Sequence, residues 1–230
     1  MSQMIIPEKW GFCMAGNEEV FCQALDIAIK ATIPGAMPIS FKETDPIQEP
    51  VFYSGPFVYY EIGIGNADTM LAVHSWLSQR MIQHKIVGVD LPNYQGGAIN
   101  YNFNEQPSAT FGEIRLALVG AAEFLASCEE KANFAFIDAC HGAPCVTNDF
   151  LGVEKLIKPG GIVMFHDTDP NCQGIHFQEH CATGIEARAA VEKLGLLDDS
   201  RPGWKKLFET HGDKSKSGHG ALWVQKLTGS

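Results

Sequence analysis

The stretch Phe57-Val-Tyr-Tyr-Glu-Ile-Gly-Ile-Gly-Asn-Ala-Asp68 decides the fold. Its apolar run from Val58 to Ile62 does not alternate cleanly, which is typical of a central parallel strand covered on both faces. Gly63 and Gly65 follow where the backbone must turn sharply, and Asn66 is a suitable N-cap for a helix. The stretch therefore predicts a strand, a glycine turn and a helix, with N–H groups of the turn left to face a ligand.

A second apolar run, residues 85–89, ends in Asp90. An acidic side chain at this position can hold the ribose hydroxyls of a nucleotide cofactor. The glycine pattern departs from the dinucleotide fingerprint, because Asp68 stands where the third glycine would pack helix against strand. A dinucleotide is therefore disfavoured, and a strand-turn-helix junction without any ligand is the plain alternative.

The bulk composition favours one domain that acts on a small molecule. The chain has 230 residues, 45% of them hydrophobic, which is enough to bury a core as one domain. The formal net charge of -10 argues against a nucleic-acid or anionic-membrane partner. No apolar stretch approaches the ~20 residues that span a bilayer, and the N-terminal segment lacks the pattern of a secretory leader, so a soluble cytoplasmic protein is expected.

The seven cysteines form no Cys-x-x-Cys pair, and reduced thiols in a reducing compartment are expected. Cys140, His141, Cys145 and His166 are an alternative zinc set. Their spacing matches no usual structural zinc pattern, so the zinc hypothesis is disfavoured.

Strands and helices alternate along most of the chain. Helices are predicted over residues 18–32, 67–81, 121–128, 146–157 and 185–196, and strands over residues 58–62, 85–89, 114–119, 133–137, 162–165, 204–210 and 221–226. Helices between strands imply right-handed crossovers and a parallel sheet, whose ligands lie outside the carboxyl ends of the strands. The last two strands have no helix between them, so a closing hairpin places an antiparallel strand in the sheet. Residues 1–56 are predicted to be a helix and loop that pack on the core, and residues 57–230 the main domain.

Acidic and imidazole side chains stand at the carboxyl ends of four predicted strands, as Glu61, Asp90, Asp138 and the pair His166-Asp167. Because Asp138 and Asp167 follow neighbouring strands, their carboxylates can converge on one cation. Hard oxygen ligands together with water favour Mg²⁺ or another divalent cation of similar preference. His166 faces either this site or the core.

His141 comes three residues after Asp138, where both side chains can point into one crevice. A neutral imidazole there can take a proton from a substrate hydroxyl while a metal ion lowers the pKa of that hydroxyl. The alternative is that His141 only caps the segment that follows.

Four motifs in this order resemble the class I S-adenosylmethionine-dependent methyltransferases. The motifs are Tyr60-Glu-Ile-Gly-Ile-Gly65 with Asp90, Phe136-Ile-Asp-Ala-Cys-His141, Leu156-Ile-Lys-Pro-Gly-Gly161 and Phe165-His-Asp-Thr168. The resemblance implies a Rossmann-like α/β fold, with helices on both faces of a seven-stranded sheet whose last strand is antiparallel. The last three motifs are similar to the metal-dependent O-methyltransferases that act on sugar hydroxyls of macrolide and aminocoumarin antibiotics, and to cephamycin-pathway proteins.

The resemblance also implies roles for individual residues. Glu61, Gly63 and Gly65 would line the methionine part of the cofactor, and Asp90 would hold its ribose. Asp138 would lie beside the cofactor and would bind Mg²⁺ together with His166 and Asp167. His141 would be the general base. The subgroup has an acidic pair where this chain has His166-Asp167, and residues 120–122 lack the polar side chain often found beside the adenine.

The predicted function is therefore transfer of a methyl group from S-adenosylmethionine to a hydroxyl of a small, glycosylated or catechol-like metabolite. One alternative is a nicotinamide-dependent oxidoreductase on a related sheet. Another is a binding protein that keeps the fold and the cofactor but has lost the chemistry. The identity of the acceptor and the formation of a homo-oligomer are left open.

Overall fold

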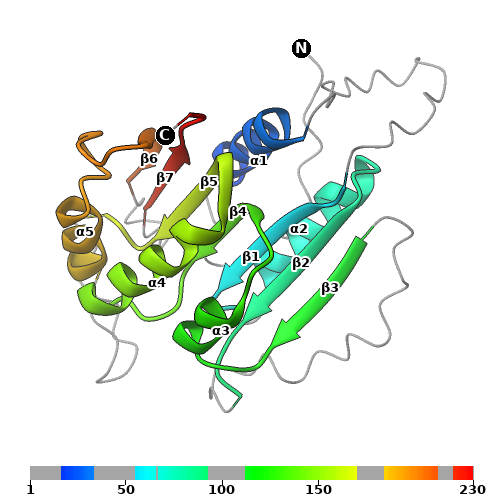
Figure 1. Cartoon of the computed structure of the whole chain (residues 1–230), viewed down its shortest axis with the longest axis horizontal. Coiled ribbons are helices and arrows are strands. Elements are labelled where there is room, and N and C mark those ends of the chain that lie inside the picture. Colours follow the sequence, from blue (N-terminus) through cyan, green and yellow to red (C-terminus); the bar gives the residue numbers. More distant parts are fainter. Residues whose placement is uncertain are drawn as a thin grey trace.

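A seven-stranded sheet with the order β3-β2-β1-β4-β5-β7-β6 forms the centre of the computed structural model (Figure 1). The structure describes residues 17–33, 55–65, 67–92, 112–169, 184–211 and 220–229. The strands are β1 (Phe57–Ile62), β2 (His84–Val89), β3 (Gly112–Ala117), β4 (Ala132–Ile137), β5 (Ile157–His166), β6 (Trp204–Thr210) and β7 (Ala221–Lys226). The first five strands pair in parallel, and β7 pairs antiparallel with both β5 and β6. The predicted fold class, including the closing antiparallel strand, is confirmed.

Helices cover both faces of the sheet (Figure 1). They are α1 (Glu18–Thr32), α2 (Asp68–Gln79), α3 (Ala121–Ser127), α4 (Ala143–Leu156) and α5 (Gly184–Lys193). Phe134 and Phe136 of β4 join the hydrophobic cluster of α1 and α2, whereas Ala135 and Ile137 join that of α3, α4 and α5. Alternate side chains of a central strand thus enter two cores, which explains its unbroken apolar sequence.

The predicted elements agree with the observed ones to within three residues except for β5, and the largest differences have local causes. Strand β5 begins at Ile157 rather than at residue 162, and it contains an irregularity near Gly160, which has a φ of +83°. Helix α4 begins at Ala143 rather than at residue 146, since Pro144 is tolerated in a first helical turn. Helix α5 ends three residues earlier than predicted, and Gly195 follows it with a φ of +70°.

The predicted cap Asn66 lies outside the described residues, as does most of the loop predicted to follow the first helix within residues 1–56. Helix α2 starts after Ala67, which has a left-handed φ of 62°. Within the described ranges, no helix combines the length and the apolar character needed to cross a membrane.

Candidate active site

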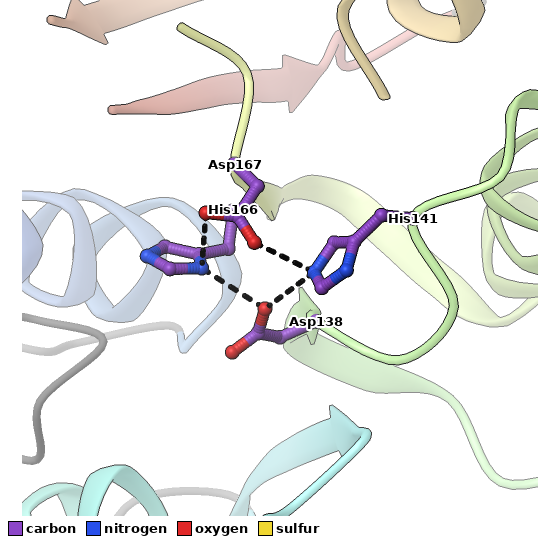
Figure 2. A group of neighbouring side chains, drawn as sticks. All are labelled: Asp138, His141, His166 and Asp167. Atoms are coloured by element: carbon purple, nitrogen blue, oxygen red, sulfur yellow. Dashed lines mark hydrogen bonds and ion pairs between the residues drawn. The ribbon is translucent and has the colours of Figure 1, made fainter. Parts of the chain in front are cut away.

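Four side chains meet at the carboxyl ends of β4 and β5, and we call them the Asp-His cluster: Asp138, His141, His166 and Asp167 (Figure 2). One ligand-type atom of each lies within 4.8 Å of those of the other three. The last paired residues of the two strands are Ile137 and Phe165, so Asp138 and His166 stand side by side at the sheet edge. His141 reaches the cluster from the loop before α4.

Nitrogen and oxygen atoms alternate around the cluster. His166 Nδ1 lies 3.0 Å from Asp138 Oδ1 and 3.3 Å from Asp167 Oδ1. His141 Nε2 lies 2.7 Å from Asp167 Oδ2 and 3.4 Å from Asp138 Oδ1. The two imidazoles are thus held by the same two carboxylates (Figure 2).

These contacts change the ionisation of all four groups. Burial by itself would lower the pKa of His141, but its hydrogen bonds to Asp138 and Asp167 raise that pKa to about 10. Burial also opposes the charge on His166, yet the two carboxylates raise its pKa well above the ordinary value. Burial opposes the charge on both aspartates as well, and the imidazoles nevertheless lower the pKa of each. At neutral pH the cluster therefore holds two carboxylates and two imidazolium groups, and their charges balance.

The glycine turn lies directly against the backbone at the end of β4, from which Asp138 projects into the cluster. Gly63 has a φ of +88°, and a methyl group added to it would lie 2.5 Å from both the Asp138 carbonyl oxygen and Ala139 Cα. Only glycine therefore lets the turn approach the β4 end so closely. Gly65 has a φ of +46°, and a methyl group there would meet nothing within 4 Å.

Asp90 supports the turn from the end of β2. Its Oδ2 accepts hydrogen bonds from the backbone N–H groups of Ile64, at 3.1 Å, and Gly65, at 3.3 Å. Its Oδ1 accepts one from the N–H of Leu91, at 2.7 Å. The residue predicted to hold the ribose therefore orders the turn, and the N–H groups of Ile64 and Gly65 bind its carboxylate instead of being left to face a ligand as predicted.

Glu61 is buried beneath the turn, with 2% of its surface exposed. Burial raises its pKa to about 8; a hydrogen bond from Tyr59 opposes this rise, and the charge of Asp138 adds to it. The Tyr59 hydroxyl donates that hydrogen bond to Glu61 Oε2 at 2.7 Å. Tyr59 was not among the residues predicted from the sequence, although residues two apart on a strand share a face, which would have indicated its pairing with Glu61.

The structure thus brings together the predicted metal ligands and the predicted base. Gly63 of the glycine turn packs on the backbone at the end of β4, Asp90 holds the turn, and Glu61 is close enough to Asp138 to be affected by its charge. The roles assigned to these residues stay predictions. Among the described residues, the group that could hold a metal ion consists of Asp138, His141, His166 and Asp167 and includes no cysteine. The alternative zinc set with Cys140 and Cys145 is therefore not supported.

Comparison with known proteins agrees with this fold. Residues 61–168 match the family model of a methyltransferase domain. The structure is similar to that of a protein from Corynebacterium glutamicum, with 14% identity, a TM-score of 0.56, and coverage of 93% of this chain and 83% of the other. No curated protein matches the sequence.

Two further solved structures are methyltransferases. The O-methyltransferase TomG from Streptomyces achromogenes, which is involved in tomaymycin synthesis and was solved in complex with SAM, has 18% identity and a TM-score of 0.50, covering 74% of this chain and 73% of that one. The SAH-bound methyltransferase PaMTH1 from Podospora anserina has 16% identity and a TM-score of 0.51, and the match covers 75% of this chain and 73% of that one. The fold expected from the resemblance to class I methyltransferases is therefore confirmed.

Proposed function

We propose that this chain, which has the class I methyltransferase fold, transfers a methyl group from S-adenosylmethionine to a hydroxyl oxygen of a small metabolite. The observation that carries the proposal is the contact between the glycine turn and the backbone of Asp138, a member of the Asp-His cluster. Because Gly63 packs on the backbone of Asp138 and Ala139, a donor bound at the turn would lie beside groups able to take a proton from an acceptor.

The cofactor would bind along the ends of β1 and β2. Gly63 and Gly65 would let its methionine part approach the backbone, above the buried Glu61, and Asp90 would accept hydrogen bonds from the ribose hydroxyls. The matched methyltransferase-domain segment, residues 61–168, includes all these residues. The SAM and SAH complexes of the two methyltransferases with this fold support the choice of donor.

His141 would act as the general base. Its Nε2 is hydrogen-bonded to Asp167, and its side chain is 22% exposed, so an acceptor can reach it more easily than the buried His166. In its neutral form the imidazole would take the hydroxyl proton as the oxygen forms a bond to the methyl carbon. The bond from that carbon to the sulfur of the donor would break, and S-adenosylhomocysteine would leave.

The donor atoms at the strand ends also fit a divalent cation. Asp138, His166 and Asp167 would hold it through two carboxylates and one imidazole nitrogen. A bound cation would lower the pKa of an acceptor hydroxyl. The protein residues would orient the acceptor and receive its proton.

The test is the variant His141→Ala, with the exposed His211→Ala as its matched control. Binding of S-adenosylmethionine, measured by calorimetry, should stay nearly unchanged in both variants. Transfer of a labelled methyl group to a panel of catechols and glycosylated phenols should fall by roughly 10² or more in His141→Ala only. Equal turnover in His141→Ala and the parent would remove His141 from the mechanism.

The same measurements separate the alternatives. Calorimetric binding of NADH in place of S-adenosylmethionine would indicate the oxidoreductase. Cofactor binding by the parent without transfer to any acceptor would favour a protein that has lost the chemistry.

A further inference from the structure

The donor set at the strand ends differs from the all-oxygen set that Mg²⁺ prefers. Two of the three side chains that lie deepest in the Asp-His cluster are carboxylates, Asp138 and Asp167, and the third is the imidazole of His166. Mg²⁺ usually binds carboxylates and water, whereas imidazole nitrogen suits Zn²⁺, Fe²⁺ and related transition-metal ions. We infer that this site, if it holds a cation as proposed above, selects a divalent transition-metal ion over Mg²⁺ through His166.

His166 cannot easily leave the cluster to make room for water ligands. Its side chain is only 3% exposed. Its backbone pairs with Ala221 of β7, and its ring stands edge-on to Phe136, with the ring centroids 6.1 Å apart. The nitrogen at the cluster, Nδ1, is therefore directed at the two carboxylates by packing as well as by hydrogen bonds (Figure 2).

The spacing of the atoms suits an ion with short bonds. For metal–ligand bonds of ~2.1 Å, neighbouring ligand atoms lie roughly 3.0 Å apart in an octahedron and roughly 3.4 Å apart in a tetrahedron. His166 Nδ1 lies 3.0 Å from Asp138 Oδ1 and 3.3 Å from Asp167 Oδ1. An ion could thus take the place of the proton on His166 Nδ1, which is released on binding, with little movement of the side chains.

His141 is not needed as a ligand. It belongs to a loop, its side chain is 22% exposed, and its Nε2 is 3.4 Å from Asp138 and 2.7 Å from Asp167. As the most exposed member, it stays available to an acceptor while hydrogen-bonded to a ligand carboxylate, an arrangement that orients groups around metal sites. We therefore expect removal of His141 to leave the metal preference unchanged.

The test is titration of the full-length, chelator-treated protein with Co²⁺, followed by visible absorption, without cofactor or acceptor. One Co²⁺ should bind per chain, and Zn²⁺ should displace it. The Mg²⁺ concentration that displaces half of the bound Co²⁺ should exceed the Co²⁺ concentration by a factor of at least about 10². Displacement by Mg²⁺ at a concentration similar to that of Co²⁺, or no binding of Co²⁺, would overturn the inference.

The variant His166→Asp replaces the nitrogen ligand with oxygen. It should lower the ratio of the Mg²⁺ concentration to the Co²⁺ concentration at half-displacement by a factor of at least about ten. The matched control His211→Asp adds the same charge on an exposed residue and should leave the ratio unchanged, as should His141→Ala. An unchanged ratio in His166→Asp would refute the role of His166.

A measurement on the parent protein covers the case in which His166→Asp does not fold. Nitrogen hyperfine coupling should appear in pulsed electron paramagnetic resonance spectra of the Mn²⁺-loaded parent, and its absence would also refute the inference. These readouts do not depend on methyl transfer. Transfer without any Co²⁺ binding would leave the proposed function in place while removing the metal preference.

Discussion

The ionisation of His141 in the metal-free protein is the most direct measure of how the Asp-His cluster works. The carboxylates of Asp138 and Asp167 overcome the effect of burial and raise the pKa of this imidazole to about 10. Compared with an ordinary pKa of about 6.5, this corresponds to about 5 kcal/mol in favour of the charged form, at 1.36 kcal/mol per pKa unit. At pH 7 only about one molecule in 10³ would carry the neutral imidazole that a general base requires.

The sign of the effect on stability follows from the same shift. Because the pKa of His141 is higher in the folded than in the unfolded chain, its stabilising contribution is complete below about pH 6.5 and is lost as the pH rises through about 10. The metal-free protein should therefore lose stability across this range, and the variant His141→Gln should lose less.

Proton NMR of the imidazole groups in the chelator-treated protein measures this pKa. His141→Gln identifies the His141 signal, whose midpoint should lie near pH 10. Asp167→Asn removes the charge 2.7 Å from Nε2 and should lower the midpoint by about 1 to 3 pH units, whereas His211→Ala should leave it unchanged. A midpoint within about one unit of 6.5 in the parent, or no change in Asp167→Asn, would refute the reasoning.

Two further predictions concern the glycine turn and helix α4. Gly63→Ala should weaken calorimetric binding of S-adenosylmethionine at least about tenfold and destabilise the fold by about 2 kcal/mol or more, because the new methyl group would lie 2.5 Å from the Asp138 carbonyl oxygen. Gly65→Ala meets open space and should cost only about 1 kcal/mol in urea unfolding; equal losses in the two variants would contradict the steric argument. Burial raises the pKa of Asp149 to about 6, so its penalty on folding grows as the pH rises from about 4 through 6. Asp149→Asn should therefore stabilise the protein by up to about 3 kcal/mol at pH 7 and by much less at pH 4, and the same gain at both pH values would exclude this cause.

The order of strands and helices could be predicted from the sequence because it depends on local patterns. The apolar run before Gly63 and the regular return of helices between strands depend on neighbouring residues alone. The rule that ligands lie outside the carboxyl ends of parallel strands then placed Asp138 and Asp167 at one edge. Loop-like residues inside an element were harder to predict, as the irregularity at Gly160 in β5 demonstrates, because pairing with β4 keeps that segment in the sheet.

The sequence by itself thus determined the class of fold and the group of residues that could carry chemistry. Only the tertiary structure decided that β1 lies between β2 and β4, that Asp90 holds the N–H groups of the glycine turn, and that His166 directs Nδ1 at two carboxylates rather than into the core. The physical reason is that periodicity and turn chemistry act over a few residues. The direction of a side chain at a strand end depends on packing against strands and helices far away in the chain.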